Sequence, residues 1–198
     1  GSSDIAGILG VCKYSTPLDI YLRKTNPLEE INQKSKRNML RGTILEPLIA
    51  CYMSLDKDIN IIQKNVRKYH AKIPLFTAEI DAIDDKGHQF EIKSAELFMQ
   101  KEWGDDFETI PIGYLVQCYW AMGINRKKEC TLAVLIGLNT VKYYNIKQNV
   151  RIYRMLQRKS LEFWNNHVLK NIPPEPKNLA DLNNLYEKQE GQKEVNIE

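Results

Sequence analysis

The stretch that decides the fold is Thr77-Ala78-Glu79-Ile80-Asp81, together with Phe90-Glu91-Ile92-Lys93 a few residues later. Both segments are short and rich in residues that favour strands, and Asp84-Asp85-Lys86-Gly87 between them has the composition of a tight turn. We therefore expect a β-hairpin. Side chains alternate between the two faces of a strand, so Glu91 and Lys93 share one face and Ile92 takes the other.

The partner strand of this hairpin supplies a second carboxylate, Asp81. Two oxygen ligands beside a cation are what a Mg²⁺-dependent phosphodiesterase requires: the carboxylates hold the metal, the metal lowers the pKa of a water, and the lysine orients or deprotonates that water. A Glu-x-Lys pair on an exposed strand is also compatible with a surface salt bridge of little energetic value. The hairpin alone leaves both interpretations open.

A third carboxylate, Glu46, lies on the apolar face of a long predicted helix. A carboxylate in such a place needs a partner, because burying it without compensation is very costly. Gly42, one turn earlier, leaves open space beside it, and Pro47 is expected to kink the helix there. Glu46 is thus well placed for a metal site, and the alternative is a structural salt bridge with Arg41 or Arg37.

Beyond the hairpin, apolar periodicity predicts the other helices and strands of the chain. They are helices over 1–10, 18–24 and 35–55, strands over 60–69, 76–83 and 89–94, a helix over 112–122, strands over 130–137 and 141–146, and a helix over 149–169. This order predicts an α/β (α+β) fold with a central mixed β-sheet flanked by helices. Pro173-Pro174 ends the predicted domain 1–174. Residues 175–198 are expected to be a polar tail, a loose amphipathic appendage in which Leu179, Leu182 and Leu185 dock weakly.

Composition excludes several classes of protein. The 198 residues are 43% hydrophobic and 27% charged, which fits one folded domain, and the net charge of +3 is too small for a histone-like binder. The apolar runs are far shorter than the roughly 20 residues that span a bilayer, so no membrane association is expected. With no basic-then-apolar leader and four cysteines without a C-x-x-C pair, we expect a cytoplasmic protein whose cysteines are reduced core residues, without a zinc ribbon or an iron–sulfur cluster.

Four stretches together carry a family resemblance. In chain order they are Gly1-Ser-Ser-Asp-Ile-Ala-Gly-Ile-Leu-Gly10, Leu40-Arg-Gly-Thr-Ile-Leu-Glu-Pro47, Asp81-x₉-Glu91-x-Lys93 and Tyr114-Leu-Val-Gln117, closed by Phe163-Trp164 and Pro173-Pro174. The sequence resembles the YqaJ-like viral recombinase family, which holds the lambda-type phage exonucleases and is a branch of the PD-(D/E)XK nuclease superfamily. The resemblance covers residue 1 to about residue 174, and Ile80 stands where the superfamily pattern has a proline.

The resemblance implies roles for the catalytic residues. Asp81 and Glu91 match the metal-binding carboxylates, with the carbonyl of Ile92 as a further ligand, and Lys93 matches the lysine that positions the attacking water. Glu46 matches the helix glutamate that reaches the metal, and Gln117 matches a glutamine beside the scissile strand. The implied cofactor is Mg²⁺, with Mn²⁺ as a substitute, at two ions per site.

DNA contacts are expected from a second group of residues. Ser3, and less directly Ser2, match a serine near the terminal phosphate, where the N–H groups of a helix start favour an anion. Relatives carry an arginine upstream of this motif that grips a 5′-phosphate, whereas the sequence here starts at the motif. A basic stripe, Arg151, Arg154 and Arg158, either contacts DNA or is a solvated face. Trp103 either stacks on a base or wedges a strand end, or it serves in the core or a lid.

The resemblance implies a Mg²⁺-dependent 5′→3′ exonuclease on double-stranded DNA that serves phage-type recombination in a bacterial or phage-infected cell. Its relatives suggest a ring-shaped trimer, with a single-strand annealing protein as a further partner. The alternatives are an endonuclease of the same superfamily and a catalytically silent DNA-binding module.

Overall fold

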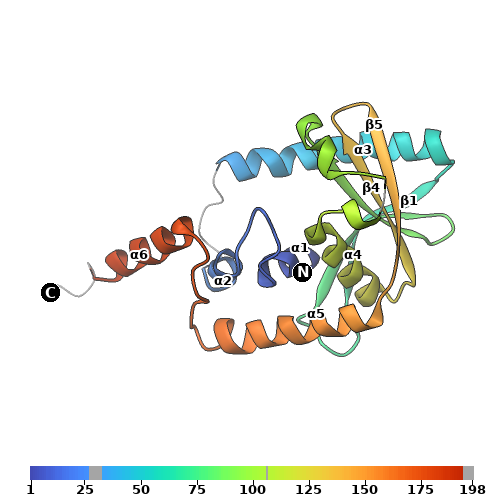
Figure 1. The fold of residues 1–198 in the computed structure, drawn as a ribbon. Helices are drawn as coiled ribbons and strands as arrows, with labels where there is room; N and C mark the ends of the chain where they lie inside the picture. Colours follow the sequence, from blue (N-terminus) through green and yellow to red (C-terminus); the bar gives the residue numbers. More distant parts are fainter. Residues whose placement is uncertain (27–32, 106, 194–198) are drawn as a thin grey trace.

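A five-stranded mixed sheet forms the centre of the molecule. The computed structural model describes residues 1–26, 33–105 and 107–193 (Figure 1). The sheet order follows the chain, β1 (Ile61–Tyr69), β2 (Thr77–Asp84), β3 (Gln89–Ala95), β4 (Glu129–Ile136) and β5 (Thr140–Lys147). β3 and β4 are parallel and the other neighbouring strands are antiparallel. The predicted hairpin is confirmed, with Gly87 at φ +75° in its turn.

Helices flank the sheet, as the sequence predicts. The helices of the described residues are α1 (Ser2–Ile8), α2 (Pro17–Thr25), α3 (Gln33–Lys57), α4 (Ile112–Asn125), α5 (Val150–Phe163) and α6 (Leu179–Lys193), with short 3₁₀ turns η1 (Leu97–Glu102) and η2 (Phe107–Thr109) and a π-helical turn η3 (Trp164–Val168). Of these, α6 projects away from the sheet (Figure 1). α4 is the crossover that a parallel pair such as β3 and β4 needs. The helix predicted over 149–169 is α-helical up to Phe163 and π-helical in the turn that follows.

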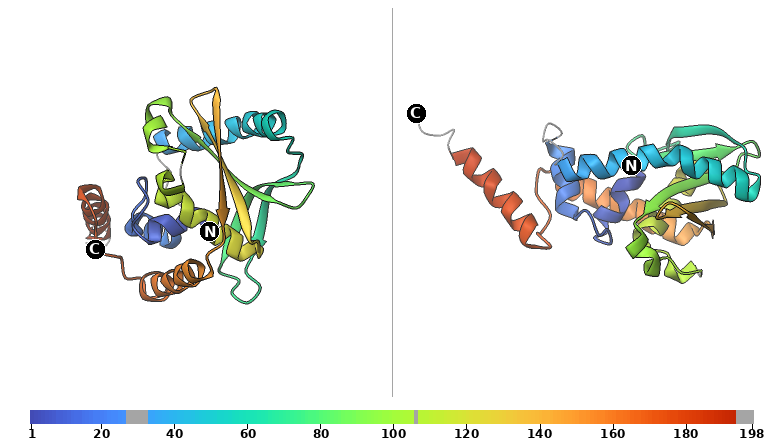
Figure 2. Two further views of the ribbon diagram at one scale, coloured as in Figure 1. Left: turned by 45° about the vertical axis from the view of Figure 1, so that its right-hand side comes forward. Right: turned by 90° about the horizontal axis from the view of Figure 1, so that it is seen from above.

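The two faces of the sheet bury different helices (Figures 1 and 2). On one face, Ile49 and Met53 of α3 pack against Phe90, Ile92 and Leu135. On the other face, α4 packs with α1 and α5 over a larger core. Ile92 thus turns toward α3, and the alternation of β3 directs Glu91 and Lys93 to the opposite face, as the period of two predicts.

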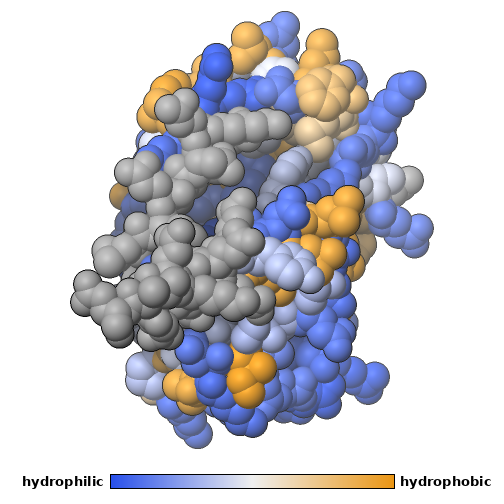
Figure 3. Space-filling view, turned by 90° about the vertical axis from the view of Figure 1, so that its left-hand side faces the viewer, coloured by the Kyte–Doolittle hydropathy of each residue, from blue (hydrophilic) through white to orange (hydrophobic). Residues whose placement is uncertain are grey.

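The surface carries apolar side chains among polar ones. In the space-filling view of Figure 3 they are scattered over the face shown, near its top, at mid-height and near its bottom. Leu40 and Ile44 of α3 are 60% and 64% exposed, and Phe98 of η1 is 82% exposed. These side chains are available to a partner surface.

The C-terminal segment, predicted as a loose amphipathic appendage, contains a helix that contacts the rest of the chain. It forms α6, whose Asp181 is 1% exposed. One carboxylate oxygen of Asp181 accepts a hydrogen bond from the Thr16 hydroxyl at 2.9 Å, and the other accepts one from the Lys177 amide at 2.7 Å. Leu185 packs against the cluster around Phe163, whereas Leu179 is exposed. A buried polar bond to Thr16, together with one of the three leucines, holds α6 in place.

Replacing Asp181 with alanine should therefore loosen α6. The change leaves the Thr16 hydroxyl and the Lys177 amide without their acceptor, so we expect the free energy of unfolding to fall by about 1–3 kcal/mol. Limited proteolysis within α6 should accelerate, as followed by mass spectrometry. Asn183→Ala, at an exposed position two residues on, is the control and should change neither quantity.

Candidate active site

Strands β2 and β3 bring Asp81, Glu91 and Lys93 together. The register that pairs Ala82 with Phe90 places Asp81 opposite Glu91. Lys93 Nζ lies 2.6 Å from Glu91 Oε1 and 3.3 Å from Asp81 Oδ2, and it donates a hydrogen bond to the Ile92 carbonyl at 3.0 Å. The Ile92 amide in turn donates to Asp81 Oδ2 at 2.7 Å. One hairpin thus assembles four of the predicted site residues.

This arrangement suits a divalent metal. Two carboxylate oxygens and one main-chain carbonyl surround a single positive charge, the Lys93 ammonium, within 3.3 Å. Oxygens of these two kinds are the ligands that Mg²⁺ accepts. Within the described residues, no three His, Cys, Asp or Glu side chains gather at metal-binding distance. The donor set that fits a metal therefore consists of two side chains and the Ile92 carbonyl.

Glu46 approaches this group from α3. Its pKa is raised by partial burial and by the negative charge of Asp81, while the charge of Lys93 and a hydrogen bond from the Asn65 side chain act in the opposite direction. Arg41 pairs with Glu96, which follows β3, so the alternative in which Arg41 neutralises Glu46 is wrong. Glu46 interacts electrostatically with Asp81 and Lys93 of the acidic site, and its metal-binding role stays a prediction. The open space beside Gly42 is confirmed.

Burial and neighbouring charges set the protonation of the site. Burial and the charge of Asp81 raise the pKa of Glu91 to about 7, despite the opposing effect of Lys93. Burial would lower the pKa of Lys93, but the Glu91 and Asp81 carboxylates outweigh it and raise that pKa well above its usual range. Lys93 thus stays protonated at neutral pH, while Glu91 exchanges a proton there.

Helix α4 borders the site through the face that carries Gln117. Tyr114 and Cys118, three residues before and one after Gln117, both interact electrostatically with Lys93. Gln117 is half-buried on the same helix. Its predicted contact with DNA remains a prediction, consistent with its place beside the site.

The structure corrects the predicted role of Trp103 in DNA binding. The sequence left open a role in stacking on a base, but the structure buries Trp103 at 1% exposure. Its ring lies 5.2 Å from that of Tyr114 and 6.0 Å from that of Tyr144, centroid to centroid. The core alternative is therefore the correct one, because an indole packed among these rings has no face for a base.

The other predicted DNA contacts lie outside this cluster. Ser3 is exposed on the first turn of α1, whereas Ser2 is 9% exposed and has little surface for a phosphate. The stripe Arg151, Arg154 and Arg158 is exposed along α5, which lies on the opposite side of the sheet from α3 (Figure 1). The arginines thus lie on the side of the sheet toward which Glu91 and Lys93 point, but Arg158 pairs with Glu162 and none of the three is recorded in contact with an acidic residue of the site. Their contact with DNA stays a prediction.

The prediction that the four cysteines are reduced core residues holds for two of them. Cys118 and Cys130 are buried, and a hydrogen bond between them raises the pKa of the Cys118 thiol, whereas Cys51 is exposed. All four are free thiols. In the part of the chain that the structure describes, no helix is long and apolar enough to cross a membrane.

Sequence reasoning missed two contacts that border the site. The Asn65 side chain of β1 acts to lower the pKa of Glu46, and the Arg41–Glu96 ion pair ties α3 to the segment after β3. The sequence suggested Arg41 only as a salt-bridge partner for Glu46. A weak signal existed for Asn65, since asparagine is depleted in strands and tolerates left-handed backbone.

Comparisons with known proteins identify the family of the chain. The family model described as "YqaJ-like viral recombinase domain" matches residues 1–128. The uncharacterized protein YqaJ of Bacillus subtilis (strain 168) is 28% identical over 172 residues, which are 85% of this chain and 53% of that protein. The chain thus spans about half the length of that curated relative.

Solved structures share the fold. The alkaline exonuclease LHK-Exo from Laribacter hongkongensis superimposes with a TM-score of 0.63 at 15% identity, over 97% of this chain and 92% of that one. Its complex with dAMP gives a TM-score of 0.64 at 16% identity over the same shares. A phage related exonuclease from Haemophilus somnus 129PT gives 0.64 at 10% identity, over 85% of this chain and 94% of that one. The predicted mixed sheet with flanking helices is confirmed, and on the match over residues 1–128 the chain belongs to the YqaJ-like viral recombinase domain family.

Proposed function

We propose that the chain is a Mg²⁺-dependent deoxyribonuclease that hydrolyses phosphodiester bonds in duplex DNA. The observation that carries the proposal is the set of oxygens from Asp81, Glu91 and Ile92 around one cation. Membership in a recombinase-type family and a fold shared with two exonucleases support it.

The site residues have distinct tasks in this proposal. Asp81, Glu91 and the Ile92 carbonyl would hold Mg²⁺ or Mn²⁺, and Glu46 would supply a further carboxylate for a second ion. The bound metal would contribute charge neutralisation at the phosphate and a lowered pKa for the attacking water. Lys93, a protonated ammonium held by two carboxylates, would orient that water by donating hydrogen bonds to it. Gln117 of α4 would contact the scissile strand.

The finer proposal is a 5′→3′ exonuclease of phage-type recombination. It draws on the motifs in the sequence and on the structural similarity to the alkaline exonuclease LHK-Exo, which has been solved in complex with dAMP. Ser3, exposed at the start of α1, is the candidate contact for a terminal phosphate. This role implies a cytoplasmic site of action in a bacterial or phage-infected cell and a single-strand annealing protein as partner.

Digestion of matched DNA substrates tests both levels of the proposal. Linear duplex labelled at the 5′ or the 3′ end and a closed circular duplex are incubated with protein and Mg²⁺, with EDTA as the blank. We expect early release of the 5′ label as mononucleotide and an intact circle. Nicking of the circle would support the endonuclease alternative, and DNA binding without cleavage of any substrate would support the silent module.

Metal affinity should rise with pH. With the Glu91 pKa raised to about 7, its carboxyl is protonated below that pH and must lose a proton before it can bind a metal. We therefore expect calorimetric titration to show Mn²⁺ affinity falling by up to about tenfold per pH unit below pH 7, and levelling off above it. Glu91→Gln cannot ionise and should bind weakly with no such slope. Equal wild-type affinity at about pH 6 and pH 8 would contradict the assignment.

We also expect a ring-shaped homotrimer. A net charge of +3 is too small to hold duplex DNA through many cycles by electrostatics alone, and a closed ring retains DNA by topology. Exposed Leu40, Ile44 and Phe98 offer apolar surface for subunit contacts. Cyclic symmetry would repeat the α5 stripe of Arg151, Arg154 and Arg158 three times around the DNA. Light scattering at micromolar concentration should give three times the chain mass, whereas a monomer with distributive cleavage would exclude the ring.

A further inference from the structure

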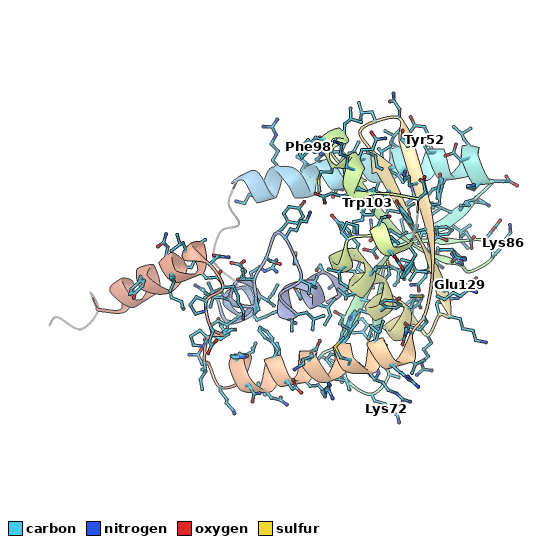
Figure 4. The ribbon with its side chains drawn as sticks, in the orientation of Figure 1. Tyr52, Lys72, Lys86, Phe98, Trp103 and Glu129 are labelled. Atoms are coloured by element: carbon cyan, nitrogen blue, oxygen red, sulfur yellow. The ribbon has the colours of Figure 1, made fainter. Side chains whose placement is uncertain are left out.

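Phe98 of η1 differs from the other phenylalanines because its ring is almost fully exposed. Phe98 is 82% exposed, whereas Phe107 is 45% exposed and the remaining three phenylalanines are no more than 6% exposed. Figure 4 shows Phe98 at the outer edge of the molecule beside α3, with Trp103 further inside. A phenyl ring left in water loses the stabilisation that burial gives, so its exposure indicates a contact with a partner.

Ion pairs hold η1 at both ends. Glu96, the residue before η1, pairs with Arg41 of α3. Glu102, the last residue of η1, accepts a hydrogen bond from Lys13 at 2.6 Å. Both carboxylates are therefore neutralised within the chain. Phe98 lies between them on an anchored segment, and such preorganisation lowers the entropy lost when a partner binds.

Positive charge lies on the same face of η1 as Phe98. Side chains three residues apart eclipse in a 3₁₀-helix, so Lys101 lies on the same side of η1 as Phe98. Lys101 is exposed, and among the described residues no carboxylate pairs with it. On α3, the exposed Arg37 lies one turn before Arg41, which contacts the start of this segment. The surface around Phe98 thus combines an aromatic ring with cations from two elements.

This surface is close to the acidic site. η1 begins four residues after Lys93, and the extended stretch from Lys93 to Glu96 spans at most roughly 10 Å. The ion pair of Glu96 reaches Arg41, which is five residues before Glu46 on α3. A DNA strand bound at the acidic site therefore lies within reach of η1.

An aromatic ring beside cations is the combination that binds single-stranded nucleic acid. Every base has a flat π face that stacks on an aromatic side chain whatever the sequence, while lysine and arginine contact the phosphates. Bases within a paired duplex stack on one another, and exposing a base face costs unstacking and unpairing. The competing occupant is a second copy of the chain, to which Phe98 offers apolar surface. The cations beside the ring favour the polyanion.

We propose that Phe98 and Lys101 of η1, together with Arg37 of α3, form a platform that binds an unpaired DNA strand next to the acidic site. Phe98 stacks on a base, and the two cations contact the phosphates. The inference rests on the proposed function, because it takes the strand at the acidic site to be the substrate. It adds a substrate preference, in that ends with unpaired bases bind more tightly than fully paired DNA.

Substitutions of Phe98 test the stacking contact. Fluorescence anisotropy is measured in EDTA, which prevents cleavage, with two labelled duplexes of equal length, one closed by a hairpin and one with unpaired bases at its end. We expect Phe98→Ala to weaken binding of the unpaired end by about tenfold and binding of the closed duplex by less than about twofold. Phe98→Trp should bind like the wild type. Phe98→Leu, which is apolar and has no π face, should bind like Phe98→Ala.

Leu97→Ala is the matched control. Leu97 is 65% exposed in the same turn and lies beside Gly137, so the substitution removes exposed apolar surface without removing the ring. It should change neither affinity. Lys101→Ala should weaken binding of both duplexes and reduce the slope of log affinity against log salt concentration by about one. Thermal unfolding checks that every variant is folded, and light scattering compares its mass with that of the wild type.

Equal binding of the unpaired end by Phe98→Ala and the wild type would overturn the proposal. Wild-type affinity in Phe98→Leu would also overturn it, because an apolar side chain without a π face would then be sufficient. A smaller mass of Phe98→Ala in light scattering would assign the ring to a contact with a second copy.

The two proposals fail separately. A wild type that shows the expected dependence on Phe98 and cleaves no DNA with Mg²⁺ contradicts only the nuclease function. A wild type that cleaves DNA while Phe98→Ala binds the unpaired end normally contradicts only the platform. A wild type that neither binds nor cleaves DNA overturns both.

Discussion

Replacing Asp81 with asparagine should abolish Mg²⁺-dependent cleavage of duplex DNA, with a loss in kcat on the order of a thousandfold or more. Asp81 Oδ2 meets both the Ile92 amide and the Lys93 ammonium, so it lies at the centre of the oxygen set. The amide of asparagine keeps the size of the side chain and removes the negative charge that a divalent cation requires. The fold should persist, because Glu91 still pairs with Lys93.

The matched control for this variant is Asp85→Asn. Asp85 is exposed in the turn of the same hairpin and contacts Asn60, so the charge change is identical and lies away from the site. Its kcat with Mg²⁺ should stay within about twofold of the wild type, as expected for a surface substitution. Near-normal cleavage by Asp81→Asn, measured beside an unchanged thermal unfolding curve, would show that the catalytic site lies elsewhere.

Replacing Lys93 with alanine should lower kcat by about 10² to 10⁴-fold and leave metal binding in place. The carboxylates and the Ile92 carbonyl remain, whereas the ammonium that orients the attacking water is gone. Lys93 also opposes the rise in the Glu91 pKa, so its loss should raise that pKa further and shift metal binding to higher pH. Calorimetry with Mn²⁺ above about pH 8 therefore distinguishes a lysine that orients the attacking water from one that organises the metal-binding carboxylates.

Lys86→Ala is the control for Lys93. Lys86 is exposed in the turn between β2 and β3, at the right-hand end of the hairpin in Figure 4. It should retain both kcat and Mn²⁺ affinity. If Lys93→Ala loses Mn²⁺ binding at high pH together with activity, then Lys93 organises the carboxylates and does not act on the water.

Local pattern was enough to predict the hairpin and the grouping of Asp81, Glu91 and Lys93. The two strands are close in sequence, and the alternation of side chains is a property of each strand by itself. The directions of Ile92 and Glu91 follow from the same rule. The register that places Asp81 opposite Glu91 is set by the short turn at Gly87.

The errors concern contacts between distant segments. Trp103 is buried because Tyr114 and Tyr144 converge on it from α4 and β5, which no local pattern around Trp103 shows. Asp181 is buried by Thr16, which is 165 residues away in the chain. Asn65 has a left-handed backbone inside β1, and the composition of β1 does not determine where such a departure from strand geometry falls.

Diffraction at the manganese absorption edge from crystals grown with Mn²⁺ tests the central claim most directly, namely that β2 and β3 form a metal centre. We expect an anomalous peak at the oxygens of Asp81, Glu91 and Ile92, and its loss in crystals of Asp81→Asn. An anomalous map without a peak at these oxygens, from crystals in which the wild-type protein cleaves DNA with Mn²⁺ after dissolution, would contradict the claim.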